Sequence, residues 1–137
     1  MSERQLRRIG AGLFLTSAVA CGAQLLIALI WSPTAVAFIL VVSGAPALIA
    51  GVWVLLPWRR RVFRYVLPMI LGVNVAFWNF AILAEGSTGP VLPTGVWIAS
   101  GVLLATQVVL PLIAIVMLGS AWRVGRKERQ TSNLETV

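Results

Sequence analysis

Five polar side chains stand out within otherwise apolar stretches of the sequence: Asn74, Gln107, Gln24, Asn79 and Ser43. Amides and hydroxyls donate and accept hydrogen bonds, but without an activating neighbour they are weak nucleophiles and poor proton carriers. In hydrocarbon, a group of this kind without a partner costs several kcal/mol. These five side chains are therefore predicted to face other helices and to bond across them. The alternative is a path for a neutral substrate, because Asn74 and Gln107 fall near the middle of their stretches.

The reactive side chains that most enzymes and metal sites need are scarce. The chain contains no His, no Asp and one Cys, and its acidic residues are Glu3, Glu85, Glu128 and Glu135. Structural zinc sites take about four Cys or His ligands, and catalytic triads need a His beside the nucleophile. We therefore predict no catalytic residue, no metal site and no cofactor, and a protein that is not an enzyme.

Four long apolar stretches must position the polar side chains. They cover residues 9–30, 35–56, 62–83 and 95–121. Each is close to the roughly 20 residues with which a helix crosses the hydrocarbon of a bilayer. Charged residues make up 11% of the chain and hydrophobic residues 59%, so a water-facing surface of ordinary polarity cannot be built. The predicted fold is an all-α, integral membrane four-helix bundle whose short links make successive helices antiparallel.

The distribution of charge predicts an orientation. The basic residues fall in the N-terminus, in the link between the second and third stretches together with Arg64 at the adjoining edge of the third, and in the polar tail over residues 123–137. With four crossings these segments share one side of the membrane, and the charge on the opposite side is Glu85. Basic segments stay on the cytoplasmic side, so both termini are predicted to be cytoplasmic. The tail is predicted to be frayed or only partly helical.

The densest group of basic residues is Arg59, Arg60, Arg61 and Arg64. Such a cluster fixes the topology, and it is also a candidate contact for anionic lipid headgroups. Binding of nucleic acid is not expected, because the basic character of the chain follows from its topology. Arginine greatly outnumbers lysine, which suggests a bacterial source and hence the inner (plasma) membrane.

Small residues recur at every fourth position on three of the predicted helices. The stripes are Gly12, Thr16 and Ala20 on the first, Ser43, Ala47 and Gly51 on the second, and Gly101 and Ala105 on the fourth. Small residues let helix backbones approach closely in lipid. The stripes therefore predict contact faces, for a helix of the same chain or of another.

Two prolines, Pro46 and Pro111, fall near the middle of the second and fourth stretches. Each removes a backbone hydrogen bond and tends to bend a helix. They are candidate hinges, either as fixed bends for packing or as points of gating. Ser43 and Gln107 are close enough along the chain to bond the carbonyls that the prolines leave free.

Few reactive side chains, small-residue stripes and short links together favour a protein that contributes surface rather than chemistry. We expect a non-catalytic accessory or assembly subunit of a larger membrane complex, with the lipid bilayer and other membrane proteins as partners. The alternative is a small homo-oligomeric carrier or channel for a neutral or lipidic substrate, suggested by the mid-span prolines and amides.

Overall fold

The computed structural model describes residues 2–31, 33–84 and 93–135, and every element in these ranges is helical. Glu85 and residues 86–92, in the link between the third and fourth stretches, lie outside the described residues. The elements are α1 (Glu3–Trp31), the 3-10 turn η1 (Pro33–Ala35), α2 (Val36–Ile39), the π-turn η2 (Leu40–Gly44), α3 (Ala45–Leu55), α4 (Arg61–Ala84) and α5 (Thr94–Glu135). With η1 to α3 counted as one segment, four helical segments are long and apolar enough to cross a membrane. The prediction of an all-α chain with four such helices is confirmed.

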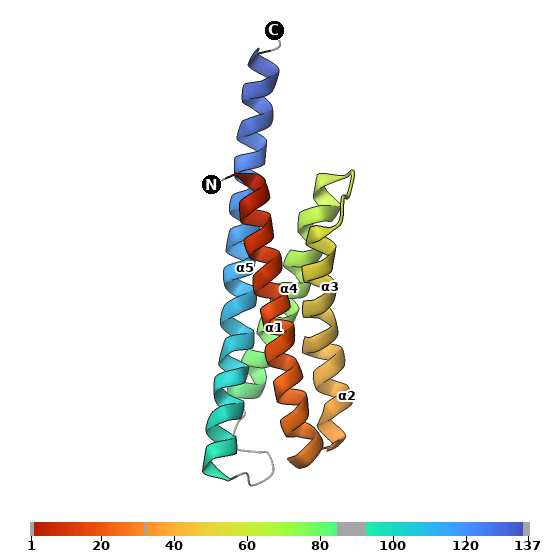
Figure 1. The fold of residues 1–137 in the computed structure, drawn as a ribbon, viewed down its shortest axis with the longest axis vertical. Coiled ribbons are helices and arrows are strands. Elements are labelled where there is room, and N and C mark those ends of the chain that lie inside the picture. The colour runs from red at the N-terminus through yellow and green to blue at the C-terminus, as the bar shows by residue number, and fades with distance from the viewer. Residues whose placement is uncertain (1, 32, 85–92, 136–137) are drawn as a thin grey trace.

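The helices form an elongated bundle (Figure 1). α1 packs against α5 and α3, and α4 packs against the same two helices. The N-terminus, the link between α3 and α4, and the C-terminal part of α5 lie toward one end of the bundle, which we call the basic end. α1 begins at a capping box in which Ser2 Oγ accepts from the Gln5 backbone N–H while Gln5 Oε1 accepts from the Ser2 N–H.

The hydrophobic core lies in the half of the bundle nearer the basic end. Phe14, Val54 and Leu118 are fully buried there and belong to one cluster that draws on all four helical segments. Gly72 of α4 leaves room for the Phe14 ring, because a Cβ on Gly72 would lie 2.9 Å from that ring. Small residues at such positions permit close packing without a large apolar side chain at the contact.

The second segment is irregular where Pro46 enters it. Proline cannot donate a backbone hydrogen bond, and its ring crowds the carbonyl four residues earlier. The chain accommodates this with the π-turn, in which the Ala45 N–H donates to the Leu40 carbonyl, five residues back. Pro46 then sits in the first turn of α3, where a missing donor costs little. The expected bend at Pro46 thus takes the form of a local π-turn.

α5 is a continuous helix of 42 residues that runs to Glu135. At 1.5 Å per residue it measures about 63 Å, roughly twice the thickness of a bilayer's hydrocarbon. Its last turns project beyond the rest of the bundle in Figure 1. The expectation of a frayed tail is wrong for the described residues, because Arg, Lys, Glu and Gln are good helix formers and no proline follows Pro111.

The three small-residue stripes face in different directions. Ser43, Ala47 and Gly51 are buried, and Gly51 lies against Leu15 and Ala11 of α1. This stripe is therefore a contact face within the chain. In contrast, Gly12 is exposed, and a Cβ on Gly12 or on Gly101 would meet no atom within 4 Å.

Candidate functional site

Four of the five polar side chains singled out in the sequence meet in one buried cluster, drawn from all four helical segments. Gln24, Ser43, Asn79 and Gln107 are each exposed by 6% or less. Gln107 Oε1 accepts from the Ser43 hydroxyl at 2.6 Å, and Gln107 Nε2 donates to Gln24 Oε1. Asn79 Nδ2 donates to Ser43 Oγ at 2.9 Å. These three bonds link α1, η2, α4 and α5 at one level of the bundle.

The two amides that donate within the cluster also bond carbonyls of their own helices. Gln107 Nε2 also donates to the Leu103 carbonyl at 3.2 Å, and Asn79 Nδ2 donates to the Val75 carbonyl at 2.7 Å. The amides therefore bond backbone carbonyls of their own helices as well as neighbouring side chains. They do not bond the carbonyls released by the prolines, as the sequence suggested they could. An uncharged, internally bonded network of this kind holds helices together and contains no nucleophile activated by a base.

Asn74 lies outside this cluster. It is five residues before Asn79, which places the two side chains about 140° apart around α4. Asn79 points into the bundle, whereas Asn74 is partly exposed and flanked by the exposed side chains of Ile70 and Phe77. The expected common level of Asn74 and Gln107 is wrong, because Gln107 shares its level with Asn79, about 7.5 Å further along α4.

The prolines inside the helices are all buried. Pro111 lies within α5, one turn from Gln107, and Pro46 follows the π-turn that carries Ser43. A third proline inside a helix, Pro68, was not among the predicted hinges; it is buried within α4. Tight packing on each of them is compatible with fixed bends.

A second polar cluster, at the basic end, joins α1, α4 and α5. Glu3 Oε1 accepts from Arg61 Nη2 at 3.0 Å and from the Tyr65 hydroxyl at 2.6 Å. Arg61 Nη2 also donates to the Trp122 carbonyl at 3.1 Å, and the Tyr65 and Trp122 rings stack with centroids 5.5 Å apart. A Cβ on Gly125 would collide with Arg61 and Glu3, so this position requires glycine for the ion pair to form as it does.

The four arginines proposed as lipid contacts divide into two pairs. Arg61 is engaged with Glu3 and is 12% exposed at its side chain, and Arg64 Nη2 donates to the Trp58 carbonyl at 2.6 Å. Arg59 and Arg60 are exposed in the link between α3 and α4. That link is braced by Trp58, which stacks on Trp53 with centroids 4.1 Å apart. Arg59 and Arg60 are thus the members of the group that are free to meet headgroups.

The basic-end cluster was not predicted, although one signal for it is present in the sequence. Glu3 is an acidic residue beside several arginines in a segment that should lie near the second link. A carboxylate among arginines at one end of a bundle is a natural ion-pair partner. The choice of Arg61 over its neighbours depends on the helix rotation, which the sequence pattern did not give.

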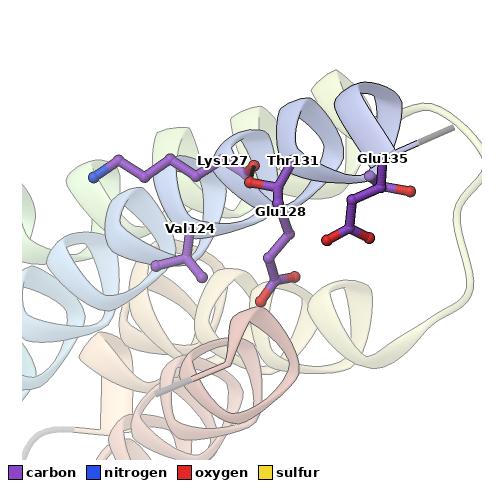
Figure 2. Close-up of a pocket in the computed structure, with 6 residues that line it drawn as sticks. Val124, Lys127, Glu128, Thr131 and Glu135 are labelled. Carbon is purple, nitrogen blue, oxygen red and sulfur yellow. Dashed lines mark hydrogen bonds between the residues drawn. The ribbon is translucent and has the colours of Figure 1, made fainter. Parts of the chain in front are cut away.

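A hollow on the projecting part of α5 offers no enclosed site (Figure 2). It is lined by Val124, Lys127, Glu128, Thr131, Ser132 and Glu135. All six belong to α5, and a single helix cannot surround a ligand. Within the described residues, no three His, Cys, Asp or Glu side chains gather where they could hold a metal ion.

Comparison of the chain with protein-family models, with curated proteins and with solved structures gave no match.

Proposed function

We propose that this protein is a non-catalytic accessory or assembly subunit of a larger membrane protein complex. The observation that carries the proposal is the outward direction of the stripes on α1 and α5, where Gly12 and Gly101 face open space. In lipid, helices associate through close packing at small residues and through hydrogen bonds. The stripe on η2 and α3 serves this purpose within the chain, and the stripes on α1 and α5 are left for helices of another protein.

The buried cluster supports this function rather than transport. A carrier or channel needs polar groups that a substrate can reach. Gln107 is fully buried, and its amide is used in bonds to Gln24, Ser43 and the Leu103 carbonyl. The cluster therefore fits a role in holding the four segments together, and the carrier alternative gains no support from it.

The proposed setting is a bacterial plasma membrane, crossed four times by antiparallel helices with both termini in the cytoplasm. The four apolar helices support the crossings. The ion pair between Glu3 and Arg61, and the bond from Arg61 to the Trp122 carbonyl, support a common side for the N-terminus, the second link and the start of the tail. The basic residues of those segments favour the cytoplasmic side.

Cysteine labelling tests this orientation. In a Cys21→Ala background, single cysteines replace Arg60 in the second link and Ser87 in the third. With a membrane-impermeant maleimide, we expect Ser87→Cys to react in intact cells and Arg60→Cys to react only after the membrane is opened. Labelling of both positions under the same condition would contradict the four-crossing topology.

The subunit proposal is tested by purifying the tagged protein in mild detergent and identifying the proteins that accompany it in fixed stoichiometry. Gly12→Leu should reduce their yield about fivefold or more, because leucine overfills the space that a partner helix needs and about 1 kcal/mol of overpacking corresponds to a factor of about five. The matched control is Gly22→Leu on the same helix, where a Cβ also meets no atom within 4 Å. Gly22 lies outside the stripe, so this variant should retain the partners. Purification without any larger membrane protein would count against the proposal.

A further inference from the structure

Asn74 carries an amide that has no hydrogen-bond partner among the described residues of its own chain. It lies near the middle of α4 (Arg61–Ala84) and is partly exposed on the outer side of that helix. Among the described residues, no side chain or carbonyl is hydrogen-bonded to it, although Asn79 on the same helix makes two such bonds. In the proposed membrane orientation, α4 would hold this amide deep in hydrocarbon, where leaving it unpaired is costly.

The surroundings of Asn74 are suited to contact with another helix. Ile70 is 59% exposed and Phe77 is 63% exposed, and both lie within one turn of Asn74 on the outer side of α4. α4 is flanked by α3 and α5, so its outer side is directed away from the bundle. An amide set among large apolar side chains combines a specific hydrogen bond with apolar contact area.

We propose that two copies of this chain pair through the outer face of α4, with Asn74 of one copy hydrogen-bonded to Asn74 of the other. A side-chain amide is both a donor and an acceptor, so it is complementary to a second copy of itself. A two-fold axis along the membrane normal places the Asn74 side chains of the two copies at the same depth. The Ile70 and Phe77 side chains then flank the pair.

This pairing requires the proposed insertion of α4 in a membrane, but it does not require the accessory-subunit function. The pairing surface belongs to α4, whereas the Gly12 stripe belongs to α1. Each of these two helices is flanked by α3 and α5. A paired chain can therefore still offer its α1 stripe to other proteins. The cysteine labelling described above tests membrane insertion separately. A chain that does not insert can therefore be distinguished from a chain that inserts but does not pair.

Energy transfer between donor- and acceptor-labelled full-length copies in phosphatidylcholine vesicles measures the pairing. Association is followed as the protein-to-lipid ratio is varied. We expect wild type to associate and Asn74→Leu to associate about tenfold more weakly, the size expected for two interhelical hydrogen bonds. Asn74→Gln should recover part of the loss. The control Thr106→Leu should associate as wild type does, because the Thr106 hydroxyl already bonds the Val102 carbonyl of its own helix.

Oxidative cross-linking locates the interface. In the Cys21→Ala background, Ile70→Cys and Phe77→Cys should give disulfide-linked dimers, whereas Val116→Cys on the exposed surface of α5 should not. Equal association of wild type and Asn74→Leu would overturn the proposal. So would a wild-type chain that stays monomeric at every protein-to-lipid ratio, or cross-links that form at Val116 and not on α4.

Discussion

Replacing Gly51 by leucine is expected to destabilise the bundle by about 3 kcal/mol, at the upper end of the usual range for overpacking. A Cβ at this position would lie 2.8 Å from Leu15 Cδ2 and 3.3 Å from the Ala11 carbonyl oxygen. The Leu15 side chain can rotate, but the backbone of α1 can yield only if α1 and α3 separate. Reversible unfolding in mixed detergent micelles measures the loss as a lower free energy of unfolding.

Two further variants make the cause of that loss visible. Gly22→Leu adds the same side chain to α1 where nothing lies within 4 Å, so its unfolding free energy should stay within about 0.5 kcal/mol of wild type. Adding Leu15→Ala to Gly51→Leu should recover part of the stability, since Leu15 is the nearest obstacle. A Gly51→Leu protein as stable as wild type would mean that α1 and α3 do not pack as described.

The helices were predictable from sequence because their signal is averaged over many residues. A stretch of about 20 apolar side chains indicates a spanning helix whatever its rotation. The contacts of single side chains depend on rotation and axial shift, which hydropathy does not specify. Asn74 and Asn79 illustrate the limit, because both are amides in one apolar stretch and yet they face opposite sides of α4.

The prediction that Asn74 and Gln107 share a level was wrong for a related reason. It rested on their positions near the middle of two apolar stretches, which indicate depth only if each helix is regular and centred on the bilayer. α5 extends well past the basic end, and the π-turn at residues 40–44 alters the rotation of the second segment just where Ser43 lies. The sequence thus identified the polar residues Gln24, Ser43 and Gln107 but could not pair them. The ion pair between Arg61 and Glu3 at the basic end could not be predicted for the same reason, because it depends on the rotation and axial shift of α1 and α4.

Replacing Gln107 by leucine should lower the free energy of unfolding by about 1–3 kcal/mol. Leucine is close to glutamine in size, so the main change is chemical. The Ser43 hydroxyl loses its acceptor at 2.6 Å, and Gln24 Oε1 loses its donor. Both groups remain buried, and a buried polar group without a partner costs more than the bond itself contributes. Unfolding in mixed micelles again measures the effect.

The double variant Gln24→Leu with Gln107→Leu separates this mechanism from a general loss of packing. It removes the unpaired amide that the single variant leaves on α1, so it should be more stable than Gln107→Leu alone. Asn74→Leu provides the matched control for monomer stability, because it removes an amide with no bond to the described residues of its own chain. Its unfolding free energy, measured at high dilution in micelles, should match wild type. If the two losses at Gln24 and Gln107 simply add, the hydrogen bond between them does not couple α1 to α5.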